Sequence, residues 1–240
     1  MQKLFIDYTP DEKIYLDPEQ SRHIAKSLRM RVGDMLTVAD CNGNEYGCQI
    51  DEITKDTVCL KICYQQANKT EPTCKVSIYQ GVPKSAKMED IIQKCTELGV
   101  CQITPVLTKR CVSRPDEKSA DKKNQRYQKI ALEAAQQSGR GIVPQINSMV
   151  TLKQALAQDN SDVKIIFYEG GGESLKSLVN PQTQSVSIYI GPEGGFEKDE
   201  VDAVINAGGS VATLGPRILR TQTAPVAALS AIMLLTDNME

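Results

Sequence analysis

Two arginines near the C-terminus are the side chains best placed to do chemistry. Arg217 and Arg220 flank a loop, residues 214–223, that lies between an apolar strand and a helix. The positive end of a helix dipole repels a cation at the helix N-terminus, so helix stability does not explain these arginines. A guanidinium there favours an anionic or carbonyl-rich substrate instead. Two ordinary surface arginines remain the alternative interpretation.

Three glycine-containing loops follow predicted strands, at residues 169–172, 191–195 and 214–219. Glycine permits positive φ and lets a ligand approach backbone N–H and C=O groups directly. Together the loops could hold a nucleoside-like cofactor. None of them fits GxxxxGK[ST] or GxGxxG, so neither a P-loop nor a dinucleotide fingerprint is present. For any one loop, a tight structural turn is the alternative.

The elements that must position these loops alternate between strand and helix. Strands are predicted at residues 74–80, 103–107 and 163–168, and helices at 123–138 and 151–158. A further helix has Ser85 as its predicted N-cap and ends at Gly99. Two strand-loop-helix units, residues 188–201 and 212–232, close the chain. This alternation favours a mainly parallel sheet covered on both faces, with a ligand at the strand ends.

The first part of the chain has a different pattern. Short strands are predicted at residues 13–16, 35–39, 45–53 and 57–64, with a hairpin turn at Asn42-Gly43 and one helix at 19–28. These elements indicate a small β-barrel or curled sheet. Residues 65–72 are polar and end in proline, which predicts a linker. We therefore expect one domain at residues 1–70 and a second at residues 71–240.

Composition sets limits on the class of protein. The 240 residues are 40% hydrophobic, which is enough for a real core. No apolar run approaches the ~20 residues that span a bilayer, and the start does not resemble a signal peptide. We expect a soluble cytoplasmic protein with no membrane partner. The eight cysteines contain no CxxC pair and His23 is the single histidine, so we expect reduced core cysteines and no metal.

The formal net charge of −2 hides an uneven distribution. Four basic residues and no acid lie between Arg22 and Arg31, and residues 109–140 hold nine basic residues against four acidic ones. Such asymmetry suits local contact with phosphates, although a solvated charged face is the alternative. The predicted RNA-binding residues are Arg22, Lys26, Arg29, Arg31, Lys84, Lys87, Arg110 and Arg140.

The run IGPEGG at residues 190–195, taken with LGPRILRTQT at 214–223, resembles the C-terminal signature of the SPOUT superfamily of methyltransferases, and most closely its RsmE family. Further matches lie at residues 87–89, 93–94, 97–100, 103–105, 110–111, 128–131 and 138–144. Residues 23–24, 28–30 and 33–34 resemble the PUA-like RNA-binding barrel of that family. The similarity covers almost the whole chain.

The resemblance implies an α/β fold: a SPOUT-type trefoil-knot domain with a mainly parallel sheet, preceded by a small PUA-like β-barrel domain. It also implies methylation of N3 of one uridine in 16S rRNA, with S-adenosylmethionine as cofactor, 16S rRNA or the small ribosomal subunit as partner, and a homodimer with cofactor sites at its interface. The cofactor-binding residues would be Glu169, Gly170, Gly171, Ile190, Gly191, Pro192, Gly195, Leu214, Gly215, Leu219, Arg220 and Thr223.

The catalytic residues would be Arg220, Arg217 and Gln222, with an arginine stabilising the anion that forms when uridine N3 loses its proton. The chain departs from the family at Gln222, where members usually have glutamate, and at Gln136. Glutamine keeps hydrogen bonding but has no charge.

Two other functions are weighed against this one. A ribose 2′-O-methyltransferase of the same superfamily usually opens its last helix with an Asn-Val-Ser-like motif, whereas this helix opens Thr-Ala-Pro-Val, which favours base methylation. A non-catalytic RNA-binding or ribosome-assembly protein that kept the fold is supported by the two glutamines. Such a protein need not retain affinity for S-adenosylmethionine, so cofactor binding separates the two classes.

Overall fold

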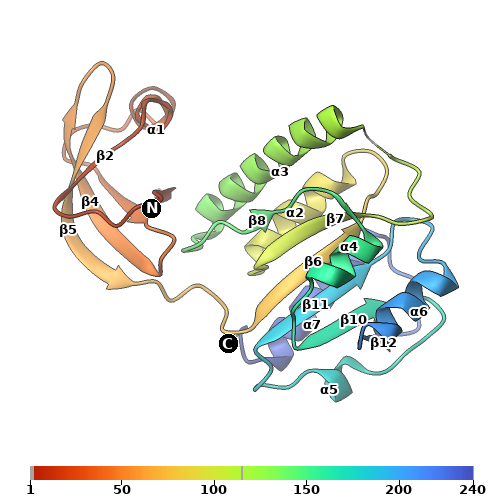
Figure 1. The fold of residues 1–240 in the computed structure, drawn as a ribbon. Helices are drawn as coiled ribbons and strands as arrows, with labels where there is room; N and C mark the ends of the chain where they lie inside the picture. Colours follow the sequence, from red (N-terminus) through yellow and green to blue (C-terminus); the bar gives the residue numbers. More distant parts are fainter. Residues whose placement is uncertain (1–2, 115, 240) are drawn as a thin grey trace. The chain divides into compact units, whose positions relative to one another are not determined.

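The computed structural model describes residues 3–114 and 116–239 (Figure 1). The chain forms two units. Unit 1 consists of Met1–Glu71 and Ala135–Val143, and unit 2 consists of Pro72–Ala134 and Pro144–Glu240. A segment from the second half of the chain therefore belongs to the N-terminal unit.

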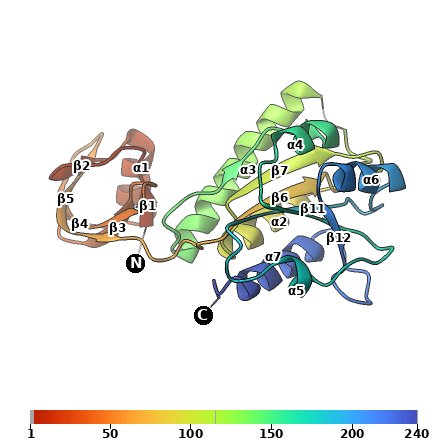
Figure 2. The same ribbon diagram turned by 60° about the horizontal axis from the view of Figure 1, so that its bottom comes forward.

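Unit 1 is built on a curled five-stranded sheet in the order β1-β3-β4-β5-β2 (Figure 2). Its strands are β1 (Lys3–Phe5), β2 (Lys13–Tyr15), β3 (Met35–Ala39), β4 (Asn44–Ile53) and β5 (Val58–Ala67). The predicted Asn42-Gly43 turn joins β3 to the antiparallel β4, with Gly43 at φ +95°. Inward-facing Ile14, Leu36 and Val38 form the core with Ile24 from the helical segment. The predicted barrel or curled sheet is confirmed.

The helical segment of unit 1 has two parts. The short helix α1 (Pro18–Arg22) is capped by Asp17, whose side chain accepts from the backbone N–H groups of Glu19 and Gln20. A π-helical turn (His23–Ser27) follows, and Arg29 at φ +54° ends the segment. The predicted helix at residues 19–28 is thus present, with a wider last turn.

The predicted linker begins too early. Gln65, Gln66 and Ala67 continue β5 and pair with Tyr46, Glu45 and Asn44 of β4. The hydrogen bonds between two strands are made by the backbone and need no apolar side chain. The polar sequence at the end of β5 therefore did not prevent its pairing with β4. The linker prediction is wrong for these three residues.

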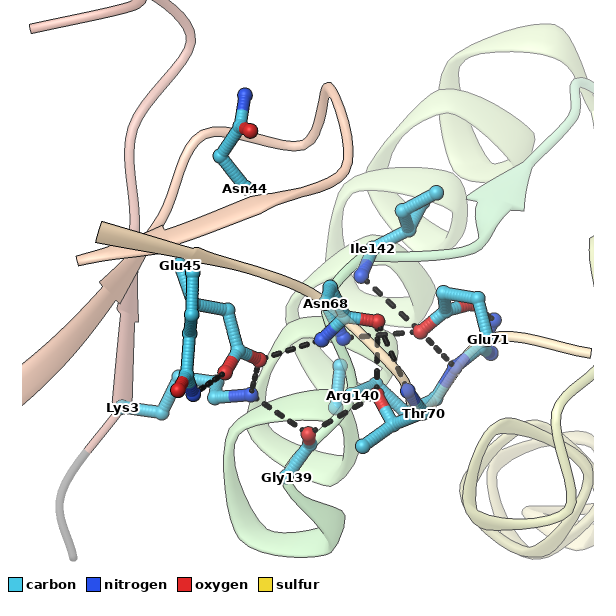
Figure 3. A network of polar contacts seen from close by, with 12 residues as sticks. Lys3, Asn44, Glu45, Asn68, Thr70, Glu71, Gly139, Arg140 and Ile142 are labelled. Carbon is cyan, nitrogen blue, oxygen red and sulfur yellow. Dashed lines mark hydrogen bonds and ion pairs between the residues drawn. The ribbon is translucent and has the colours of Figure 1, made fainter.

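A buried lysine holds the segment at residues 139–143 within unit 1 (Figure 3). Lys3 donates from Nζ to Glu45 Oε1 at 2.5 Å and to the Gly139 carbonyl at 2.6 Å. Asn68 also donates to Glu45. Burial raises the pKa of Glu45, but the hydrogen bonds from Lys3, Asn68 and Gln66 outweigh burial and hold this pKa below its ordinary value. The carboxylate therefore remains charged at neutral pH.

Glu71 anchors the same segment from the other side. Its carboxylate accepts from Arg140 Nη2 at 2.5 Å and from the backbone N–H groups of Gly141 and Ile142 at 2.9 and 3.2 Å (Figure 3). The Arg140 side chain is only 5% exposed. A buried ion pair is costly to break because one charge stays buried without its partner.

We expect Glu71→Ala to lower the free energy of unfolding by about 2–4 kcal/mol, since it takes the carboxylate from a buried guanidinium and two backbone donors. Denaturant unfolding measures this change. Glu89→Ala is the matched control because its partner Arg126 is 67% exposed, and such surface pairs contribute about 0–1 kcal/mol. Equal, small effects of both substitutions would contradict the prediction.

Unit 2 contains the second sheet, in the order β12-β10-β11-β6-β7-β8, with β9 also pairing with β7. Its strands are β6 (Lys75–Gly81), β7 (Gln102–Leu107), β8 (Gln145–Ile146), β9 (Val150–Thr151), β10 (Val163–Phe167), β11 (Ser185–Ile190) and β12 (Ser210–Ala212). All of these pairings are parallel. The predicted mainly parallel sheet is confirmed.

Helices cover both faces of this sheet (Figure 2). They are α2 (Lys87–Glu97), α3 (Glu117–Ser138), α4 (Leu152–Gln158), α5 (Leu175–Leu178), α6 (Lys198–Asn206) and α7 (Thr223–Leu235). Successive residues of a strand face opposite sides of the sheet. Tyr79, Ile166 and Tyr189 lie on one side, where they pack with residues of α4 and α6. The other face is covered by α2, α5 and α7, and α7 contacts both α2 and α5.

Two predicted helix starts are wrong. Ser85 does not cap α2, because it has φ +60° and the helix begins at Lys87 after Ala86, without a side-chain cap. Helix α3 begins at Glu117 rather than 123. Asp116 explains the earlier start, because its side chain accepts from the Ser119 N–H at 2.8 Å in the manner of an N-cap.

The eight cysteines are free thiols. Cys48, Cys59, Cys74, Cys95 and Cys111 are buried, as predicted for core residues, whereas Cys63 and Cys101 are exposed. Burial raises the pKa of Cys48 to about 12, so this thiol is unreactive at neutral pH.

Candidate active site

A cavity of about 850 Å³ lies at the carboxyl ends of β10, β11 and β12. These three strands are neighbours in the sheet, although β10 and β12 are more than 40 residues apart in the chain. Because parallel strands end at the same edge, the loops that follow them surround one space. The three predicted glycine loops thus line a single cavity.

Most residues predicted to bind a cofactor line this cavity. They are Glu169, Gly171, Ile190, Gly191, Pro192, Gly195, Leu214, Gly215, Leu219 and Arg220. Gly170 and Thr223 are not among the lining residues. Gly170 lies against the Tyr168 ring, and Thr223 begins α7 with its N–H donated to the Arg220 carbonyl.

The cavity also has lining residues that the sequence analysis missed. Phe167 and Tyr168 lie at the end of β10 and the start of the first loop. Thr221 follows the third loop and lies between Arg220 and Gln222. The last residues of a strand lie at the same edge of the sheet as the loop that follows it. Their position in the sequence could therefore have indicated that they line the cavity. Ile218 is a further lining residue and is 87% exposed.

The second loop is closely folded. A Cβ at Gly191 would lie 2.9 Å from Gly195 Cα, and one at Gly81 would lie 2.6 Å from Pro192 Cδ. Gly195 has φ +69° and donates its N–H to the Pro192 carbonyl at 2.9 Å. Only glycine fits where backbone approaches backbone this closely.

A buried polar network joins the second loop to the third. Thr221 donates its hydroxyl to the Gly191 carbonyl at 2.8 Å, and Gln80 Nε2 donates to Thr221 Oγ1 at 3.1 Å. Gln80 is fully buried in β6. Such a network fixes the distance between these two parts of the cavity wall.

The predicted catalytic residues divide into two groups. Arg217 and Arg220 are exposed and line the cavity, and neither forms an ion pair within the described ranges. Their charges are therefore available to a ligand. Gln222 is not a lining residue, and its Oε1 is buried with no hydrogen-bond partner among the residues described.

The predicted RNA-binding residues lie in different environments. Arg22, Lys26, Arg29 and Arg31 are exposed around the helical segment of unit 1, and Lys84 and Arg110 are exposed in unit 2. Lys87 is half-buried. Arg140 needs correction, because it is 4% exposed and paired with Glu71 and so cannot present its guanidinium to a phosphate.

The acidic residue Glu193 lines the cavity and receives a hydrogen bond from Lys87. Burial raises the pKa of Glu193, but hydrogen bonds from the Lys87 ammonium and from backbone N–H groups outweigh burial and lower this pKa. With Glu169, this carboxylate places two acidic groups on a cavity wall that also carries Arg217 and Arg220.

Across the described parts of the chain, no group of three or more His, Cys, Asp and Glu side chains could hold a metal ion. The helices described include none that is both long and apolar enough to cross a membrane.

Two protein-family models match the chain. A model of an RNA methyltransferase domain matches residues 69–233, and a model of an RNA methyltransferase PUA domain matches residues 16–63. Ribosomal RNA small subunit methyltransferase E of Bacillus subtilis is 38% identical to the chain, and the alignment covers 99% of this chain and 98% of the relative.

Solved structures are similar over nearly the whole chain. Ribosomal RNA small subunit methyltransferase E from Neisseria gonorrhoeae, solved with bound S-adenosyl methionine, has a TM-score of 0.90 at 28% identity and covers 98% of both chains. A protein from Legionella pneumophila, solved with the bound cofactor SAM, has a TM-score of 0.88 at 31% identity and covers 97% of this chain and 96% of its own.

Proposed function

Because the chain belongs to the ribosomal RNA small subunit methyltransferase E (RsmE) family and is an S-adenosylmethionine-dependent methyltransferase of 16S rRNA, we propose that the methyl group goes to N3 of one uridine. The fold class predicted from the sequence is confirmed by the same findings: a SPOUT-type α/β domain with a mainly parallel sheet, preceded by a PUA-like domain.

The observation that carries the proposal is the single cavity formed by three glycine loops with two arginines at its wall. Its volume of about 850 Å³ is within the ~300–1,000 Å³ range of small-molecule sites. Apolar Phe167, Ile190 and Leu214 suit an adenine ring, and Glu169 and Glu193 suit a ligand with a sulfonium and an ammonium group. We propose that the ten predicted residues lining the cavity bind the cofactor.

S-adenosylmethionine supplies an activated methyl group when bound. Methyl transfer needs no protein nucleophile, so the chain must align the acceptor nitrogen and stabilise its deprotonated form. Arg220, with Arg217 beside it, is proposed to place positive charge against the uracil carbonyl oxygens, where the negative charge develops. We keep Gln222 out of this proposal because it does not line the cavity.

Exposed cations are proposed to hold the surrounding RNA. Arg22, Lys26, Arg29 and Arg31 lie together in sequence on unit 1, whose curled sheet matches the PUA family model. Lys84 would contribute from unit 2. We propose residues 1–70, joined in the structure by residues 135–143, as the RNA-binding domain, and the rest of residues 71–240 as the methyltransferase domain. The substrate implies that the protein acts in the cytoplasm.

We also propose that the protein acts as a homodimer, as the family resemblance implies. Two exposed apolar side chains of unit 2 are consistent with a surface that a second copy covers. Ile218 lines the cavity and is 87% exposed, and Leu234 lies on the mostly apolar helix α7 and is 59% exposed. The proposed dimer interface would cover these two side chains.

The decisive assay uses small subunits from a strain that lacks this methylation, incubated with the protein and labelled cofactor. Mass spectrometry of the nucleosides is expected to show N3-methyluridine at one position. Subunits from a strain with the methylation intact are the control and should take up no label. A 2′-O-methyl product would favour the ribose methyltransferase, and no product with no cofactor binding would favour the non-catalytic protein.

A further inference from the structure

Two cations outside the cavity bind the second glycine loop together with the two residues that lead into α6, a segment that spans residues 191–197. Lys87, at the start of α2, donates from Nζ to Glu193 Oε1 at 2.7 Å. Arg110, after β7, donates from Nη1 to the Gly194 carbonyl at 2.6 Å and from Nε to Glu197 Oε1 at 2.9 Å. Lys87 and Arg110 thus hold the loop from outside at its middle and at its C-terminal end.

Glu193 is bound by more than one donor. Its two carboxylate oxygens also accept from the Lys84 backbone N–H, at 3.1 and 3.3 Å. The side chains of Lys87 and Glu193 are 35% and 25% exposed. A half-buried pair with an additional backbone donor is screened less than a surface pair, so it holds its geometry better.

Arg110 lies directly on the loop backbone. A Cβ at Gly194 would be 3.1 Å from Arg110 Cβ and 3.4 Å from its Cδ, so the arginine stem covers this glycine. Glu197, the other partner of Arg110, is the N-cap residue of α6 and forms a capping box with Glu200. Arg110 therefore links the loop backbone to the helix that follows it.

The inner side of the same loop is cavity wall. Gly191, Pro192, Glu193 and Gly195 all line the cavity. Since Glu193 and the Gly194 carbonyl are the groups held by Lys87 and Arg110, moving either cation would move the wall. A cation already committed to a carboxylate would also have to break that pair before it could bind a phosphate.

We propose that Lys87 and Arg110 are positioning residues for the cofactor, which hold the loop at residues 191–197 in its binding conformation, and that they do not act as RNA phosphate contacts. The inference rests on the proposed function in one respect, that the ligand of the cavity is S-adenosylmethionine.

Calorimetry of RNA-free protein tests the proposal. Lys87→Met and Arg110→Met are each expected to weaken S-adenosylmethionine binding about tenfold, since each removes a charged hydrogen bond to the loop. Lys94→Met is the matched control for Lys87, because Lys94 lies on the same helix and pairs with Asp90 at 2.8 Å. Lys109→Met, which breaks the neighbouring pair with Asp199, is the control for Arg110. Both controls should bind within about twofold of wild type.

Conservative variants separate positioning from a general loss of structure. Lys87→Arg should restore affinity because it can still reach Glu193. Arg110→Lys should restore it only in part, because an ammonium lacks the planar fork that serves Gly194 and Glu197 together. In steady-state assays of Lys87→Met and Arg110→Met, the KM for the cofactor should rise, while kcat and the salt dependence of RNA binding should stay at wild-type values.

Wild-type cofactor affinity in both Met variants, with weaker RNA binding and a shallower salt slope, would overturn the proposal and establish phosphate contacts. A wild-type protein that does not bind S-adenosylmethionine would instead overturn the proposed function, so the two failures are distinguishable. If a Met variant does not fold, the comparison of Lys87→Arg with Arg110→Lys still tests the unequal rescue.

Discussion

Gly191→Ala is expected to reduce the affinity for S-adenosylmethionine about a hundredfold or more. The new Cβ would lie 2.9 Å from Gly195 Cα and 3.0 Å from its carbonyl carbon. Both are backbone atoms, so the loop itself must shift, and Pro192 and Gly195 would move with the cavity wall. A loss of about 2.8 kcal/mol in contacts with the displaced wall corresponds to a hundredfold weaker affinity. Calorimetry and the KM for the cofactor measure this effect.

Gly47→Ala is the matched control. Its Cβ would also clash, at 2.1 Å, but with the ring of Tyr64, a side chain that is 48% exposed in unit 1 and can move aside. Cofactor affinity should therefore stay at the wild-type value. If Gly191→Ala bound the cofactor as well as Gly47→Ala does, the loop would be more tolerant than its packing indicates, and its role as a cofactor wall would be wrong.

Arg220→Ala is expected to slow methyl transfer about 10²–10³-fold at saturating cofactor and RNA, the usual loss when one group that stabilises transition-state charge is removed. Cofactor affinity should change only a few-fold, because the Arg220 backbone stays in place to accept from Thr223 and Ala224. Single-turnover kinetics, with cofactor binding measured separately, checks both statements.

Arg126→Ala is the control for the loss of an exposed arginine from unit 2, since Arg126 pairs with Glu89 and is not among the residues that line the cavity. Its rate should match wild type. Arg220→Lys should recover part of the rate, because an ammonium keeps the charge but not the bidentate geometry. A wild-type rate for Arg220→Ala would remove this arginine from the mechanism.

The sequence predicted those parts of the fold that depend on local pattern. Apolar strands followed by glycine loops, and the Asn42-Gly43 hairpin, are properties of a few neighbouring residues, and the structure has them where expected. The convergence of the loops could only be inferred, because it depends on the sheet order β12-β10-β11, which long-range packing decides.

The differences between sequence and structure have two causes. Some residues contact partners that are distant in the chain, and Ser85 has a backbone conformation that its residue type does not reveal. The sequence gives no sign that Arg140 differs from the other exposed cations. In the structure it is buried and pairs with Glu71, which is 69 residues away in the chain. Lys87 and Arg110 resemble free cations in the sequence, but Lys87 pairs with Glu193 and Arg110 pairs with Glu197, each partner more than 80 residues further along the chain, which is why we propose loop positioning in place of phosphate contact. Ser85 has the right type for an N-cap but the wrong backbone conformation, at φ +60°.

The return of residues 135–143 to unit 1 has a consequence for biosynthesis. When residue 71 has been made, Glu71 has no Arg140 to pair with and Lys3 has no Gly139 carbonyl to bind. At ~5–20 residues per second, the ribosome needs roughly 4 to 15 seconds more to deliver these partners. The N-terminal unit therefore cannot complete these contacts as it emerges and must wait until the whole of α3 and the residues after it have been translated. An isolated fragment of residues 1–71 would remain in that waiting state.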